Sequence, residues 1–166
     1  SIRGPASHLA LVGIRSTIGA TSRDGIVPLL LNRDIGGPLM RTVGDTARVF
    51  NVIAGYDPAD PTTKSYENHK VDDYTAHLTR SGLSKVRLGV LRQIYDSEAA
   101  DKQILAVFAQ ALKDLESSGA VIIDPVTIPD FEKLAKATGF CGRFRYDINN
   151  YLKTLENDIE IKTLQD

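Results

Sequence analysis

Short apolar runs flank a helical pattern in the second half of the chain. Residues 86–91 and 120–124 are apolar runs, and residues 97–117 between them place apolar side chains on one helical stripe. A strand, a helix and a strand with connections this short predict two parallel strands joined by a right-handed crossover. This pattern predicts an α/β fold. The stripe consists of Ile104, Leu105, Phe108, Leu112 and Leu115.

A second helical pattern begins after Thr42. This threonine is a suitable N-cap, and Asp45 stands three residues later, in the capping-box position. The apolar residues that follow recur at helical spacing, and Gly55 is expected to close the helix. These apolar residues are Val43, Ala47, Phe50 and Ala54.

The remaining segments show weaker patterns. Residues 1–31 are apolar and interrupted by glycines, which predicts short buried strands and turns. Residues 32–38 have the composition of a loop, and residues 57–70 predict a long surface connection with a possible subdomain border. Residues 130–155 predict a second helical stretch that two glycines are expected to interrupt.

Composition and charge exclude several classes of protein. The 166 residues fit one domain, with 20 Lys and Arg against 21 Asp and Glu, so charge alone would not hold a nucleic acid. One cysteine excludes an internal disulfide framework and is compatible with a reducing compartment. No apolar run reaches the roughly 18–20 residues that span a bilayer, and no signal-peptide pattern opens the chain. We therefore expect a soluble, cytoplasmic protein that binds neither nucleic acid nor membrane.

Few residues suggest chemistry by their spacing alone. Cys141 is interpreted as a structural thiol, and Asp72 and Asp73 as solvated surface residues. The chain lacks the short motifs that bind phosphate or dinucleotide and the nucleophile elbow of other hydrolases, so no cofactor is expected. The histidines are too scattered to predict a metal site. They are His8, His69 and His77.

Four segments near the start of the chain form a more specific pattern. They are residues 1–6 (SIRGPA), 11–17 (LVGIRST), 22–28 (SRDGIVP) and 34–43 (DIGGPLMRTV). In order and spacing they resemble the motifs GGSIRxPA, LVGLKPT, SRxGxxP and DxxGPMxRTVxD of the amidase signature family. Each motif is short, but four in register over about 45 residues are a strong signal.

Two later segments extend this resemblance, and two positions depart from it. Residues 56–61 (YDPADP) are similar to the family's GxDPxDP segment, and residues 143–152 match the pattern EFKxxLNxYL more loosely. Ser16 stands where the family's LKPT motif has proline, and Gly37 adds a second glycine to the DxxGP motif. Both departures are expected to change local rigidity.

The resemblance implies a hydrolase with a Ser–cis-Ser–Lys triad. Ser1 matches the nucleophile by position, whereas the cis-serine and the lysine lie upstream of it in the family. Residues 1–166 then correspond to the C-terminal-side portion of one amidase domain, and we expect the rest of the same chain upstream of Ser1. A chain without the triad lysine is expected to be inactive alone.

The same resemblance implies a fold, a reaction and a supporting residue. The fold is α/β, with a mixed, largely parallel sheet flanked by helices on both faces. The reaction hydrolyses a small carboxylic amide to an acid plus ammonia or an amine through a serine acyl-enzyme, with no metal or cofactor. Arg3 is expected to support the nucleophile turn by pairing with a carboxylate. The substrate-binding residues are unknown, because the apolar residues at 26–31 are interpreted as core packing.

Two other functions remain open at this point. An N-terminal serine can use its own α-amine as the base, as in N-terminal nucleophile hydrolases, although the Gly4–Pro5 pair is expected to interrupt the strand which that arrangement needs. Family members also serve as A-type subunits of amidotransferases that act on misacylated tRNA. The looser match at residues 143–152 favours a free-standing amidase.

Overall fold

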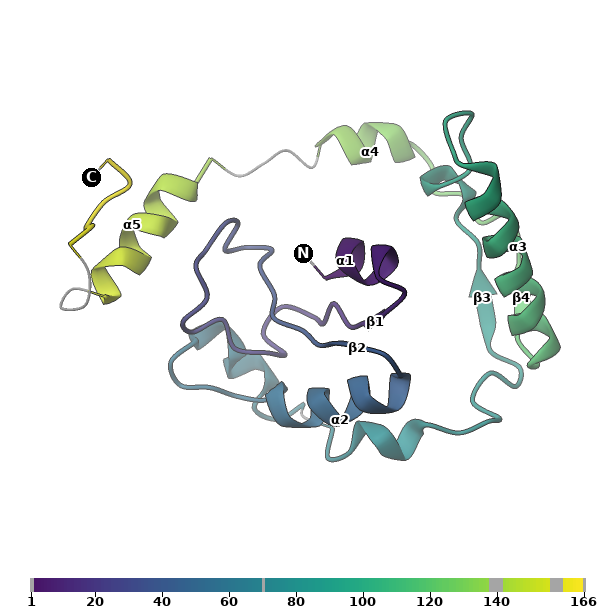
Figure 1. Cartoon of the computed structure of the whole chain (residues 1–166), viewed down its shortest axis with the longest axis horizontal. Coiled ribbons are helices and arrows are strands. Elements are labelled where there is room, and N and C mark those ends of the chain that lie inside the picture. Colours follow the sequence, from purple (N-terminus) through teal and green to yellow (C-terminus); the bar gives the residue numbers. More distant parts are fainter. Residues whose placement is uncertain (1, 70, 138–141, 156–159, 166) are drawn as a thin grey trace. The chain divides into compact units, whose positions relative to one another are not determined.

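The contacts within the chain divide it into two units. In the computed structural model, residues 2–69, 71–137, 142–155 and 160–165 are described (Figure 1). The first unit comprises residues 1–76 and 140–166, and the second comprises residues 77–139. The sequence suggests a possible subdomain border within residues 57–70, whereas the two units divide between residues 76 and 77.

The first unit combines short strands with helices, and its elements include α1 (Arg3–His8), β1 (Val12–Gly13), β2 (Leu39–Met40), α2 (Val43–Ile53), η1 (Pro61–Tyr66), η2 (Tyr74–His77) and α5 (Phe144–Thr154). Strands β1 and β2 are antiparallel, with Val12 opposite Met40 and Gly13 opposite Leu39. Helix α2 packs against both strands.

The opening segment was predicted as strands and turns, which is correct for β1 and wrong for α1. Pro5 is compatible with this helix because it lies in the first turn, where no intrahelical N–H bond is required. The helix buries Ala6, and contact with β1 stabilises a six-residue helix that local sequence alone would not favour.

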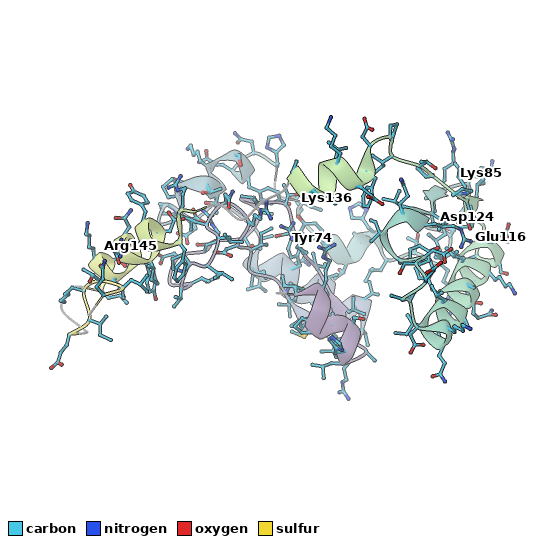
Figure 2. All side chains as sticks on the ribbon, turned by 90° about the horizontal axis from the view of Figure 1, so that it is seen from above. Tyr74, Lys85, Glu116, Asp124, Lys136 and Arg145 are labelled. Atoms are coloured by element: carbon cyan, nitrogen blue, oxygen red, sulfur yellow. The ribbon has the colours of Figure 1, made fainter. Side chains whose placement is uncertain are left out.

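The core of the first unit surrounds Phe50 of α2. Phe50 packs with Ala20 and Ala54, and all three are buried. Tyr74, labelled in Figure 2, meets the Phe50 ring edge-on at a centroid distance of 4.8 Å. Its hydroxyl hydrogen-bonds to that of Tyr66. This cluster fixes α2 against the segments before and after it.

The predicted helix after Thr42 is confirmed. The Thr42 hydroxyl oxygen accepts the backbone N–H of Asp45 at 3.0 Å, which is the expected N-cap bond. Val43 was expected on the apolar face but is 56% exposed. Gly55 follows the helix, and its N–H donates to Ala20 O at 3.0 Å, so it joins the helix end to the preceding loop.

The second unit contains the predicted parallel pair, and its elements include β3 (Arg87–Gly89), η3 (Arg92–Ile94), α3 (Lys102–Ser117), β4 (Val121–Ile123) and α4 (Phe131–Ala137). Arg87 lies opposite Val121 and Gly89 opposite Ile123. Helix α3 packs against β4. Asp124, labelled in Figure 2, accepts two hydrogen bonds of 2.6 Å from the Arg92 guanidinium, which ties η3 to the end of β4.

Helix α3 differs from its prediction at its start and on its apolar stripe. It begins at Lys102, not near Ser97, because the Asp101 carboxylate accepts the N–H groups of Gln103 and Ile104 and caps the helix there. Within the stripe, Ile104 is 69% exposed, whereas the three leucines are half-buried.

The α/β class is confirmed, although the described residues form two separate two-stranded sheets, one antiparallel and one parallel. The stretch at 130–155 is two helices, α4 and α5, with a turn at residues 142–143. Cys141 lies outside the described residues. Among the helices of the described residues, none combines the length and apolar character needed to cross a membrane.

The cap of α2 makes a direct test of this fold. Replacing Thr42 by alanine leaves the Asp45 N–H without its acceptor, and we expect the free energy of unfolding to fall by about 1 kcal/mol. Thr42→Ser keeps the hydroxyl oxygen and should change it by less than about 0.5 kcal/mol. Urea unfolding of both variants measures the difference, and equal stabilities would contradict the cap.

Candidate active site

The predicted nucleophile, Ser1, lies outside the described residues, but the segment that follows it is described. Ile2 is the N-cap residue of α1, and its carbonyl oxygen accepts the Ala6 N–H at 3.0 Å. Arg3 is the first residue of α1 and is exposed. Within the described part of the chain, no carboxylate forms an ion pair with Arg3, so its supporting role stays a prediction.

Two glycines from different motifs pack against Ile2. A methyl group added to Gly13 would lie 2.9 Å from Ile2 Cγ2, and one added to Gly37 would lie 2.7 Å from Ile2 Cδ1 and overlap the Ile14 carbonyl oxygen. Real Cβ contacts are essentially never this short. Only glycine therefore fits at both positions without a shift of the surrounding atoms.

These contacts explain why the fourth motif has glycine at residue 37. When DIGGP is aligned with DxxGP, Gly37 is the motif's own glycine and Gly36 is the additional one, which corrects the sequence interpretation. Gly37 allows the Ile14 carbonyl group and the Ile2 side chain to approach the same point. The Ile14 N–H donates to Pro38 O at 3.3 Å and continues the β1–β2 pairing. The first, second and fourth motifs thus meet around the residue next to Ser1.

Ser16 is buried where the family has proline. Its hydroxyl has no hydrogen-bond partner among the described residues. Serine therefore places a buried polar group where the family has the apolar ring of proline.

Arg23 and Asp60 link the third motif to the YDPADP segment. The guanidinium donates to both carboxylate oxygens, at 2.8 Å from Nε and 2.9 Å from Nη2, and the Arg23 backbone N–H adds a bond of 3.0 Å. The two side chains are only 10% and 7% exposed. A two-point, buried ion pair fixes the relative orientation of the two loops.

Further hydrogen bonds surround this pair. Asp60 also accepts the Thr62 N–H at 3.1 Å and caps η1, and Arg23 donates to Leu31 O and the Thr62 hydroxyl. The hydrogen bond from Arg23 is the main cause that lowers the pKa of the Asp60 carboxyl far below its usual value, and burial opposes it. The same bond raises the pKa of Arg23.

The segment predicted as a surface connection is therefore partly buried. Thr63 has no exposed surface, and its hydroxyl donates toward the carbonyl oxygens of Asp57 and Asp60 while accepting the Asp57 N–H. Packing around Asp60 and Thr63 overrides the polar character of this segment.

Asp34 of the fourth motif holds a neighbouring turn. Its carboxylate accepts the N–H groups of Leu29 and Leu30, both at 2.8 Å. The Thr21 hydroxyl donates to Gly36 O at 2.9 Å. Motif residues thus serve as cross-links between loops.

Most of the apolar residues at 26–31, interpreted from the sequence as core, are exposed in the described part of the chain, although Pro28 is buried and Leu30 half-buried. Ile26 is 43% exposed, and Val27 and Leu29 are about 60% exposed. Ile26 and Leu31 instead line a cavity of about 620 Å³ that helix α5 closes on one side. The sequence did not reveal this cavity because α5 is more than a hundred residues away along the chain.

The histidines and acidic residues considered as metal ligands in the sequence do not form a cluster in the described residues. His8 and Asp72 are exposed, and His69 Nδ1 lies 2.9 Å from Ser65 O. Within the described ranges, no three His, Cys, Asp or Glu side chains are grouped closely enough to hold a metal ion.

Comparisons with known proteins match this arrangement. The amidase family's sequence model matches residues 1–166. The chain is 36% identical over 162 residues to a probable amidase of Arabidopsis thaliana, covering 93% of this chain and 30% of that protein. It is 33% identical over 170 residues to the A-type subunit of glutamyl-tRNA(Gln) amidotransferase from Acinetobacter baylyi, covering 99% and 34%. The structure of a peptide amidase from Stenotrophomonas maltophilia superposes with a TM-score of 0.83 at 34% identity, covering 99% and 33%.

The motif contacts and the α/β elements define a protein built on the amidase fold. The chain belongs to the amidase family. The resemblance seen in the four motifs is thereby confirmed. The chain spans about a third of the length of the curated relatives it matches.

Alanine substitutions at the adjacent residues Gly36 and Gly37 test the close packing around Ile2. In Gly37→Ala the new methyl group meets a backbone carbonyl, and we expect a loss of about 1–3 kcal/mol in the free energy of unfolding. In Gly36→Ala the nearest atoms are 3.7 Å away, so stability should stay the same or rise by up to about 1 kcal/mol. Thermal and urea unfolding compare the two, and equal losses would count against the Ile2 contact.

The Arg23–Asp60 pair predicts a pH dependence. The carboxyl's pKa is lower in the folded protein than in the unfolded chain, so protonation favours unfolding. Its stabilisation is complete above pH about 5, roughly one unit above the pKa of Asp in the unfolded chain, and is lost progressively as the pH falls further.

We expect Asp60→Asn to lower the free energy of unfolding by about 3 kcal/mol at pH 7 and to flatten its decline in acid. Asp24→Asn is the control, because it changes an exposed carboxylate next to Arg23 in the sequence. Urea unfolding at pH 7 and pH 3 gives both quantities. An unchanged acid slope in Asp60→Asn would refute the assignment.

Proposed function

We propose that the protein is an amidase that hydrolyses a small carboxylic amide to an acid plus ammonia or an amine, with Ser1 as the nucleophile. One observation carries this proposal: four family motifs occur in register, and Ser1 occupies the nucleophile position of the first. Similarity to a probable amidase and to a peptide amidase supports it.

The proposed reaction needs a base outside residues 1–166. A serine hydroxyl is a poor nucleophile at neutral pH, and a neutral lysine can take its proton through a second serine. Attack of the Ser1 oxygen on the amide carbonyl carbon forms a tetrahedral oxyanion. Collapse breaks the C–N bond as the amine nitrogen receives the proton, and water then cleaves the ester to release the acid and restore Ser1. Donors aimed at the oxyanion contribute about 3–4 kcal/mol each in a comparable hydrolase.

The described residues contribute to positioning. Gly13 and Gly37 pack against the Ile2 side chain from two sides, which would help to hold the residue next to Ser1. Arg3, one residue further, would add a carboxylate pair from the part of the protein upstream of Ser1. A fixed nucleophile turn keeps the hydroxyl in attack geometry, which is a large part of catalysis by proximity.

A second candidate is an A-type amidotransferase subunit. The observation that favours it is 33% identity over 99% of the chain to the A-type subunit of a glutamyl-tRNA(Gln) amidotransferase. In that case the released ammonia would pass to a misacylated tRNA in a complex with partner subunits. The RFRYDINNYL segment at residues 143–152 favours the free-standing amidase.

Hydrolysis by the protein that includes the residues upstream of Ser1 tests the proposal. We expect it to release ammonia or amine from simple amides, and hydroxylamine to trap the acyl group as a hydroxamate. Ser1→Ala should lower kcat by about a million-fold, the loss seen when another serine hydrolase loses its nucleophile.

Three outcomes would redirect the assignment. Unchanged turnover in Ser1→Ala would show that Ser1 is not the nucleophile. Ammonia transfer to misacylated tRNA that requires a partner complex selects the amidotransferase function. A native chain whose mature N-terminus is Ser1, established by N-terminal sequencing together with activity of residues 1–166 alone, selects the N-terminal nucleophile mechanism.

A further inference from the structure

The cavity beside α5 combines apolar walls with carboxylates. It has a volume of about 620 Å³ and lies within the first unit, between the loop at residues 23–28, the segment at 59–62 and one face of α5. A volume in this range accommodates a small organic molecule. Its apolar surface comes from Ile26, Pro28, Leu31, Tyr151 and Leu155.

Arg23 lines the cavity, but its charge is already matched. Both oxygens of Asp60 accept from its guanidinium, and its remaining contacts go to Leu31 O and the Thr62 hydroxyl. The guanidinium is therefore occupied, and a carboxylate or phosphate ligand would have to displace Asp60 from a buried, two-point pair.

Asp147 of α5 is a buried carboxylate of the lining whose partner, Arg143, is largely exposed. Its side chain is only 4% exposed, and it lines this cavity and a second one beside it. Oδ1 lies 3.2 Å from Arg143 Nη2, whose side chain is 61% exposed. Oδ2 has no hydrogen-bond partner within the described residues. Arg143 contacts only Oδ1, so Oδ2 can accept a hydrogen bond from a further donor.

The polar neighbours of Asp147 suit the same kind of ligand. Asn150, Tyr151 and Thr154 line the cavity along α5 and offer oxygen acceptors. Asp24 adds a further carboxylate to the lining, so three carboxylates stand against two guanidiniums, those of Arg23 and Arg143, which leaves one negative charge in excess. This charge balance attracts cations and repels anions.

We propose that this cavity binds an alkylammonium group, with the ammonium at Asp147 and the carbon chain against Ile26, Leu31 and Leu155. An ammonium carries three N–H donors, which match the free oxygen of Asp147 and the acceptors beside it. The Tyr151 ring in the same wall offers a further favourable contact for a cation. Such a group is the form that an alkyl amine takes at neutral pH, whether as part of an amide substrate or as a released amine.

Binding of n-butylammonium, 1-butanol and butyrate to the full protein at pH 7 tests the site. These probes share a four-carbon chain and differ in charge. We expect butylammonium to saturate the protein and to bind at least about tenfold more tightly than the other two, as measured by calorimetric titration or ligand-observed NMR. Equal binding of the three, or no saturable binding because another part of the protein fills the cavity, would overturn the proposal.

Variants assign the binding to this cavity. Asp147→Asn keeps the shape and removes the charge, and it should abolish the preference for butylammonium. Asp72→Asn removes an exposed carboxylate away from the lining, and it should change binding by less than about twofold. Asn150→Asp adds a carboxylate to the lining and should strengthen binding, which keeps the test decisive if Asp147→Asn does not fold. An unchanged preference in Asp147→Asn, or weaker binding in Asn150→Asp, would contradict the assignment.

Inhibition of amide hydrolysis by butylammonium distinguishes whether the bound ammonium belongs to the substrate or product of the reaction or to a separate ligand. Competitive inhibition by butylammonium supports a site for part of the substrate or for the amine product, and binding without inhibition supports a separate amine ligand. Both results require the Asp147-dependent preference. Failure to hydrolyse any amide would remove the proposed function and leave the binding measurement valid.

Discussion

The Arg23–Asp60 ion pair is the contact on which most of the first unit's loop structure depends. It joins residues 37 positions apart, and each partner also organises its own loop: Asp60 caps η1, and Arg23 holds the carbonyl of Leu31. Since both side chains are nearly buried, neither can lose its partner without leaving a charge with little access to water. The cavity walls at residues 23–28 and 59–62 are fixed relative to one another by this pair.

The described residues of the family motifs act mainly as a scaffold around Ile2, the neighbour in sequence of the proposed nucleophile Ser1. Gly13 and Gly37 accommodate Ile2, Asp34 ties down the turn at Leu29 and Leu30, and Thr42 starts α2. These residues come from the second and fourth motifs, and the contacts of each are hydrogen bonds or close packing with neighbouring loops. The proposed chemistry depends on such a scaffold because acyl transfer tolerates little displacement of the attacking oxygen.

Short-range sequence signals correctly predicted α2 and the β3–β4 pair, which depend mainly on residues close in the sequence. The cap at Thr42 and the short apolar runs around α3 gave α2 and the parallel pair β3–β4, since caps and short connections leave few alternatives. Helix α1 was missed because Gly4 and Pro5 disfavour a helix locally, and its packing against β1 is tertiary. The burial of Asp60, the role of Gly37 and the exposure of Ile26 all depend on partners distant in sequence, which periodicity does not report.

The first unit is discontinuous: residues 1–76 are followed by the whole second unit before α5 returns to them. Tyr151 reaches the carbonyl oxygen of Gly25 across 126 positions of sequence, at a long 3.5 Å. During synthesis on the ribosome, the loops joined by the Arg23–Asp60 ion pair emerge before α5. The apolar residues of these loops that line the cavity are not covered by α5 until that helix has left the exit tunnel. The ligand cavity is thus the last feature of this unit to be completed, and the nascent chain carries an uncovered apolar surface while the intervening unit is being made.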